Sequence, residues 1–395
     1  MKKGLMIITA VLTASTVFAL EYNVDLETDA LYYNYIKNQG LADELSLMQS
    51  APTSVPQALE LSQSNTQAFE QITLKLRQPT DNMKFVFDGR FYISPGIETL
   101  GYVIDNAYFS YTNGDFVLYT GKQRIKWGTG YAWNPSDLLQ PTKDILEPGR
   151  YLEGIYALRM EYSNDFITPS LIISPDTQAI SSPISQNYRF ALQLYKLVGS
   201  ADFFLNTIYQ YQTLQTIGGA ISWDFGPAIL NLEGAGVRYI NAADNIRTYM
   251  GLDNGATVMF DWLAGIQKQL TQDTFLYIEY YRNNWGLDNN EFGRMYELAN
   301  TIPSVLSLSQ LVIKKDYAMV NFSYTWNDKL TLGVAGIYGP DDGTVLIYPQ
   351  IIWLENQSFD ILLGYLQNCT TSRDGEGQMG IPIYNYLEMR LRAYL

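Results

Sequence analysis

Short and long connections alternate along this chain, and this regularity limits its fold more than any other feature. The connections join about eighteen segments that have the two-residue alternation or the composition of β-strands. These segments lie near residues 23–35, 66–78, 83–94, 101–112, 115–127, 153–163, 166–174, 187–197, 201–212, 216–225, 227–240, 256–270, 273–284, 316–326, 329–338, 344–355, 358–368 and 384–395.

The connections fall into two classes by position. Every even-numbered segment except the last is followed by a tight turn, such as Asn113-Gly114 or Gly199-Ser200, whereas the connections after odd-numbered segments are mostly long. An outer-membrane barrel requires short turns at one rim, long loops at the other and an even number of strands. The sequence therefore predicts an all-β fold: a transmembrane antiparallel up-and-down β-barrel of about 18 strands, with short periplasmic turns and long extracellular loops.

The last segment has the clearest alternation. Leu387 and Met389 alternate with Glu388 and Arg390, so this strand has an apolar face and a charged face. It resembles the C-terminal strand that barrel-assembly machinery recognises, although that pattern usually ends in Phe or Trp and this chain ends in leucine. Closure would place this strand beside the acidic first segment, and opposite charges across the seam would help to set the register.

One hairpin assigns the faces of the strands. Asn113-Gly114 is a two-residue type I′ signal, which sets Thr112 opposite Asp115 and therefore Asp105 opposite Lys122. We expect Asp105 and Lys122 to lie on a charged face that lines the lumen, with aromatic side chains on the other face. An eighteen-stranded barrel is wide enough for an aqueous channel, so inward charges stay hydrated.

The first residues have the pattern of an export signal. Lys2 and Lys3 precede a short apolar stretch, and small residues follow up to Ala19. We expect residues 1–19 to be a cleaved signal peptide and residues 20–395 to form a single outer-membrane β-barrel domain. The expected location is the bacterial outer membrane of a Gram-negative-type envelope, in contact with its lipid.

Charge and missing residue types exclude several classes of function. The chain has 26 basic and 40 acidic residues, a formal charge of −14, whereas nucleic-acid binding needs a basic surface. It has no histidine, which removes Ser-His-Asp and Cys-His nucleophile systems and the usual imidazole metal ligands. Cys369 is the only cysteine, so no internal disulfide can form. We therefore expect no enzyme activity, no metal and no cofactor.

The segment from Gly121 to Asp137 is the most distinctive part of the chain. Its order, Gly-Lys-Gln, then Trp-Gly, then Asn-Pro-x-Asp, resembles a strand-and-loop signature of porin-like outer-membrane β-barrel families, some of them linked to capsule assembly. The resemblance covers about 25 residues. It implies a channel for small hydrophilic solutes, and a homotrimer is a frequent assembly among general porins.

The same segment suggests a charged constriction. Lys122, Arg124 and Lys126 are expected to project from one face of the fifth segment as a basic ladder, and the third long loop, 128–152, follows. In porins the third such loop folds inward, and the Gly and Pro residues of this one suit a bent, ordered excursion. A transverse field there would sort solutes by charge. The expected pore-lining and selectivity residues are Lys122, Arg124, Lys126, Asp105, Asp137, Asp144, Glu147, Arg159 and Glu161.

Two alternatives stay open at this level. The charges could pair with one another, or with Glu153, Arg159 and Glu161 of the next segment, only to hold the loop in place. Trp127 and Trp133 could stack on a sugar or instead anchor and pack the loop.

The predicted function is passive diffusion of small hydrophilic solutes or ions. The alternative is a non-transporting surface barrel that binds capsule or other polysaccharide through its extracellular loops.

Overall fold

The computed structural model describes most of the chain's regular structure and part of the connections. The described residues are 21–34, 66–79, 82–93, 101–139, 153–175, 188–211, 213–240, 251–252, 257–288, 291, 314–341, 343–356, 359–369 and 385–394. The expected signal peptide, residues 1–19, lies outside these ranges, and so do Asp144 and Glu147 of the expected constriction.

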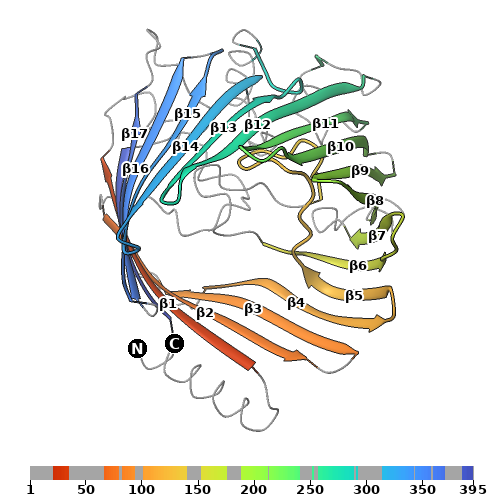
Figure 1. Ribbon diagram of the computed structural model, residues 1–395, viewed down its shortest axis with the longest axis horizontal. Helices are drawn as coiled ribbons and strands as arrows, with labels where there is room; N and C mark the ends of the chain where they lie inside the picture. The colour runs from red at the N-terminus through yellow and green to blue at the C-terminus, as the bar shows by residue number, and fades with distance from the viewer. Residues whose placement is uncertain are drawn as a thin grey trace.

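Eighteen strands are present in the described ranges, and they form one ring (Figure 1). The first nine are β1 (Glu21–Asn34), β2 (Thr66–Pro79), β3 (Met83–Ile93), β4 (Gly101–Asn113), β5 (Phe116–Gln123), β6 (Ile155–Tyr162), β7 (Thr168–Pro175), β8 (Tyr188–Val198) and β9 (Ala201–Gln210). The other nine are β10 (Leu214–Asp224), β11 (Ile229–Tyr239), β12 (Met259–Thr271), β13 (Thr274–Arg282), β14 (Asp316–Trp326), β15 (Leu330–Gly339), β16 (Thr344–Asn356), β17 (Phe359–Asn368) and β18 (Asn385–Tyr394). Each overlaps one predicted segment, which confirms the predicted strands.

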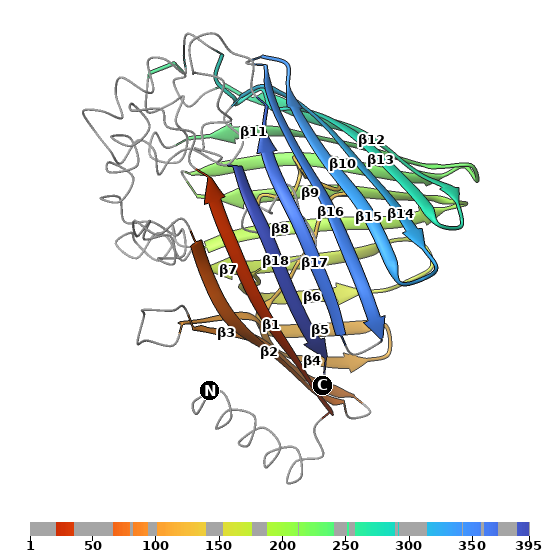
Figure 2. The same ribbon diagram turned by 90° about the vertical axis from the view of Figure 1, so that its left-hand side faces the viewer.

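The ring is closed by its first and last strands. Each strand pairs antiparallel with its neighbours in the chain, and β1 also pairs with β18 (Figure 2). The register sets Glu27 opposite Arg392 and Asp29 opposite Arg390, as the acidic and mixed segments predicted. Closure leaves no unpaired strand edge, which is the condition for placing a sheet in lipid. The predicted up-and-down β-barrel is confirmed.

The β4–β5 hairpin differs from its prediction. Asn113 pairs with Phe116, so the two turn residues are Gly114 and Asp115 rather than Asn113 and Gly114. Gly114 has a φ of 58°, and Asp115 is not among the residues with positive φ. A glycine at the first central position is typical of a type II′ turn, whereas a type I′ turn needs positive φ at both positions. The predicted register was therefore wrong by two residues.

A β-bulge in β4 changes the predicted faces. The register between β3 and β4 shifts at Asp105, so Asp105 and Asn106 both lie on the lumen side, as the two residues of a bulge do. Lys122 pairs with Ala107 and Tyr156 instead of Asp105. It therefore lies in the outward-facing rows. The placement of Lys122 on the lumen face was wrong, because the hairpin arithmetic contained no bulge.

Large apolar side chains cover the outside of the ring. Ile217 is 64% exposed and Phe260 is 58% exposed, and the outward Phe85 and Phe109 pair with ring centroids 4.9 Å apart. Soluble proteins rarely expose apolar surface on this scale. A belt of this kind is the surface that a barrel presents to hydrocarbon.

In the described part of the chain, no helix combines the length and the hydropathy that crossing a bilayer requires.

Candidate functional site

Residues 124–139 run inside the ring instead of extending β5. The strand ends at Gln123, four residues before its predicted end, and the chain then crosses the interior (Figure 1). It contacts β11 and β13, which lie 11 − 5 = 6 and 13 − 5 = 8 positions from β5 in an 18-stranded ring. This segment, called the crossing loop below, therefore reaches from one wall of the barrel to the opposite wall.

Glu233 of β11 binds two separate parts of the crossing loop. Its Oε2 accepts hydrogen bonds from the backbone N–H groups of Thr129 at 2.9 Å and Gly130 at 3.4 Å. Its Oε1 accepts bonds from both the N–H and the hydroxyl of Ser136, each at 2.8 Å. Asn206 of β9 also donates to the Ser136 hydroxyl at 3.1 Å. One carboxylate thus joins the two ends of the loop tip to the wall.

Glu279 of β13 binds the tip itself. Its two oxygens accept the N–H groups of Tyr131 at 2.7 Å and of Ala132 and Trp133 at 3.1 Å each. Tyr277 donates its hydroxyl to the same carboxylate and accepts a second, longer bond of 3.2 Å from the Tyr131 N–H. These contacts satisfy backbone groups that would otherwise be buried without partners.

Aromatic rings fill the space between the loop tip and the wall. Trp133 stacks on Tyr281 with centroids 5.5 Å apart and an interplanar angle of 18°, and it contacts Tyr317 at 5.7 Å. The Tyr131 ring lies 5.0 Å from that of Tyr277. Trp133 is buried, so it packs the loop and leaves no face for a sugar.

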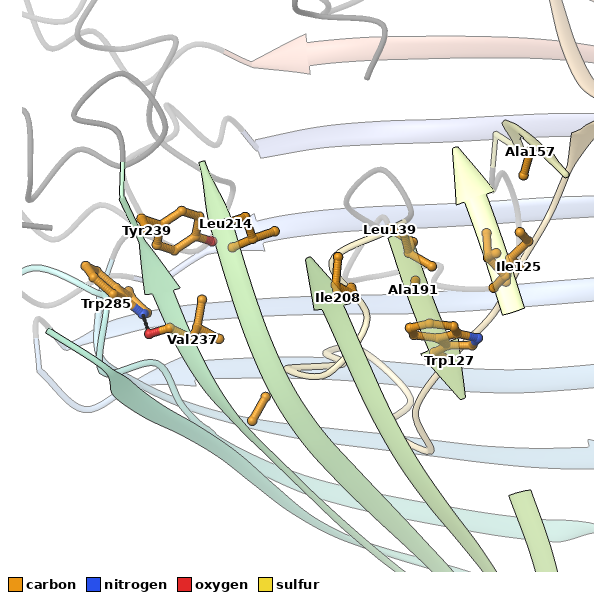
Figure 3. Close-up of a cluster of buried hydrophobic side chains, with 12 residues drawn as sticks. Ile125, Trp127, Leu139, Ala157, Ala191, Ile208, Leu214, Val237, Tyr239 and Trp285 are labelled. Carbon is orange, nitrogen blue, oxygen red and sulfur yellow. Dashed lines mark hydrogen bonds between the residues drawn. The ribbon is translucent and has the colours of Figure 1, made fainter. Parts of the chain in front are cut away.

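A second apolar cluster holds the base of the loop. Ile125, Trp127 and Leu139 of the loop are buried against wall residues that include Ala191 and Ile208 (Figure 3). Trp127 therefore also packs the loop. Its backbone N–H donates to Asp137 at 3.0 Å, which places the Asp137 carboxylate within the loop rather than opposite a basic ladder.

Two of the expected charges meet on the β3–β5 wall. Arg90 donates two hydrogen bonds, of 2.8 and 2.9 Å, to the carboxylate of Asp105, and Arg124 lies 3.0 Å from the same group. Asn106, beside Asp105 in the bulge, donates to Asp88 at 2.6 Å, and Asp88 is paired with Arg77 at 2.6 Å. The bulge thus brings acidic and amide groups of β4 to the arginines of the lumen.

The remaining expected residues are dispersed. Lys122 pairs with Glu153 and lies 5.6 Å from the centre of the Tyr156 ring on the outward face. Arg159 pairs with Glu161 on its own strand and lies over the Tyr119 ring at 4.5 Å. The pairing that was the alternative to a selectivity filter is thus present for both cations.

Lys126 is placed differently from the other cations. It lies between Ile125 and Trp127, whose side chains are buried against the wall, and is itself exposed. Among the described residues no ion pair of Lys126 is found. Its side chain therefore lies outside the wall cluster and stays open to solvent.

The residues that position the loop were not singled out from the sequence. Glu233 and Glu279 are the only acidic residues of β11 and β13. Asp261 of β12, between these strands in the sheet, accepts the Asn284 N–H at 2.7 Å. An isolated acidic residue on the inward face of a strand was the available signal. Its significance depends on which loop reaches it, and that is a tertiary property.

The fold defines the class of structure, a closed transmembrane β-barrel with an internal loop. No family model and no curated protein matches the chain. Solved structures do. OccAB1 of Acinetobacter baumannii is similar with 10% identity and a TM-score of 0.59, over 95% of this chain and 96% of that chain. OccK11 (OpdR) and OccK5 (OpdH) of Pseudomonas aeruginosa have 7% and 10% identity and TM-scores of 0.54 and 0.53. They match over 95% of this chain and 95% and 97% of their own. This likeness concerns the fold.

Proposed function

We propose that this protein is a porin-like channel of the bacterial outer membrane, through which small hydrophilic solutes or ions diffuse passively. The crossing loop carries the proposal, because it narrows a closed barrel whose outer surface is apolar and whose inner surface is charged. A barrel of eighteen strands without such a loop would enclose a wide aqueous lumen. A loop held across the lumen is the element that sets the size of what passes.

The loop contacts do not favour polysaccharide binding through Trp127 and Trp133. A sugar-binding aromatic needs an accessible ring face, and both rings are buried against the barrel wall. The proposal assigns no catalytic residue. It includes export through a signal peptide at residues 1–19 and insertion by the barrel-assembly machinery at the C-terminal strand. The resemblance of the segment Gly121 to Asp137 to porin-like families is a further part of the proposal.

The structure offers two lysines for testing where solutes pass. We expect Lys126→Gln to shift the reversal potential of the channel under a salt gradient toward cation preference, because a positive charge leaves the lumen. Lys122→Gln is the matched control. It removes the same positive charge from a nearby position, but from the outward face of the barrel. It should therefore leave the reversal potential unchanged.

The measurement is single-channel conductance of the refolded protein in a planar bilayer. Stable current steps, with a shift for Lys126→Gln alone, would support a diffusion pore that passes the crossing loop. A folded barrel that passes no current would contradict the proposed channel function. Equal shifts of the reversal potential for the two lysine variants would contradict a solute path that passes Lys126 and not Lys122.

A further inference from the structure

We infer that Glu233 and Glu279 are the positioning residues of the constriction: they fix the crossing loop, and with it the bore of the channel, through hydrogen bonds that only a carboxylate can accept. The inference rests on the proposed channel function for its effect on current. The holding of the loop is observed in the protein itself and can be measured without any current.

The hydrogen-bonding capacity of both carboxylates is fully used. An ionised carboxylate has two oxygens with about four acceptor sites and no donor. Glu233 accepts four bonds, two on each oxygen, and all come from the crossing loop. Glu279 also accepts two on each oxygen, three from the loop and one from Tyr277. Three loop N–H groups on each carboxylate give 3 + 3 = 6 backbone donors.

The loop, rather than a cation, balances these charges. Neither carboxylate has a Lys or Arg nitrogen within 4.0 Å among the described residues, whose ion pairs lie elsewhere. Their ionisable neighbours include Asp261 of β12 and Tyr277 and Tyr281 of β13. Successive backbone N–H groups that converge on one anion form a nest, and the tip supplies such a nest to each glutamate.

The bonding pattern explains why glutamine could not replace these residues. The side chain of glutamine has the same shape, but one oxygen becomes an NH₂ group. At position 233 that group would face two donors of the loop, and at position 279 it would face either two loop N–H groups or one loop N–H group and the Tyr277 hydroxyl. Either glutamine would therefore replace at least one backbone bond of the loop by a donor-to-donor contact. Charge-assisted bonds to the remaining oxygen would also become ordinary ones.

Docking of the loop also removes acidic groups from the passage. Glu233 is 4% exposed and Glu279 is fully buried, both beneath the loop. Lys126, before the residues that bind the two glutamates, stays exposed. The two glutamates therefore determine both the width of the passage and which charges it presents, although neither touches a passing solute.

The test reports the loop position directly. In a Cys369→Ser background, Ala132→Cys places a thiol on the loop tip, where the native side chain is 3% exposed. We expect slow reaction with a water-soluble maleimide in this protein. Adding Glu279→Gln, or Glu233→Gln, should raise the labelling rate about tenfold or more, because the tip leaves the wall. The same glutamine variants without the engineered thiol should show a larger single-channel conductance, by about twofold.

Asp261→Asn is the matched control. It also removes one buried negative charge from this wall, from the strand between β11 and β13, but Asp261 binds Asn284 instead of the crossing loop. We expect wild-type labelling and wild-type conductance. Circular dichroism and the urea midpoint of each variant separate loop release from loss of the barrel.

The outcomes distinguish the two proposals. Labelling and conductance that stay at wild-type values in folded glutamine variants would overturn the inference, and so would equal effects of Asp261→Asn. Faster labelling in a barrel that passes no current would support the holding role and reject the channel. Should a glutamine variant fail to fold, Ser136→Ala, which removes the side-chain bond to Glu233 and the bond from Asn206, should still raise the labelling rate. No change there would count against the inference.

Discussion

Excising the loop tip, residues 130–135, and joining Thr129 to Ser136 through two glycines will raise the single-channel conductance several-fold. The tip is the part of the loop that reaches β13, and its removal widens the bore from one wall to the other. The junction is short, because the N–H groups of Thr129 and Ser136 bind the same Glu233 carboxylate at 2.9 and 2.8 Å. The change can be measured in planar bilayers.

Tyr131→Phe serves as the control for this excision. It removes a hydroxyl that accepts one bond from Asn321 at 2.9 Å and leaves the backbone contacts of the tip to Glu279 in place. We expect its conductance to equal that of the wild type. If the excised barrel is folded and conducts no better than Tyr131→Phe, the crossing loop does not limit the current.

Asp105→Ala will destabilise the barrel by about 3 kcal/mol, the cost typical of removing one partner from a buried ion pair. Asp105 is almost fully buried and receives two bonds from Arg90 and a third contact from Arg124. Without it, two guanidinium groups face each other on the lumen wall. Urea unfolding in detergent micelles, followed by tryptophan fluorescence, measures the loss.

Glu161→Ala is the comparison for this prediction. Its pair with Arg159 is within one strand and partly open to water, so the expected loss is about 1 kcal/mol or less. Equal losses for the two variants would show that the β-bulge cluster at Asp105 contributes no more than a surface pair.

Local sequence determined the strands and their order around the ring. Alternation of apolar and polar side chains is visible within each segment, because successive residues of a strand point to opposite faces. Turn residues such as Gly199-Ser200 mark the short rim, and the long links mark the other. Closure then follows, since lipid leaves no place for unpaired edges. These are properties of neighbouring residues, so they could be predicted without coordinates.

The faces of individual residues were less secure. A two-residue period carries a face assignment along a strand only while the pairing is regular, and one extra residue reverses it. The bulge at Asp105 adds one such residue to β4. Asp105 therefore faces the lumen, whereas Lys122 faces outward. No turn signal or change of composition marks it in the sequence.

By itself the sequence determined the barrel, its rims and the presence of a distinctive segment after the fifth strand. Only the tertiary structure decided what that segment does, because its partners are Glu233 and Glu279, 97 to 148 residues away in the chain. Hydrogen bonds from a loop to a distant wall depend on the curvature and closure of the whole ring. A single acidic residue in an apolar strand becomes a loop anchor only where closure brings unpaired N–H groups within about 3 Å of it.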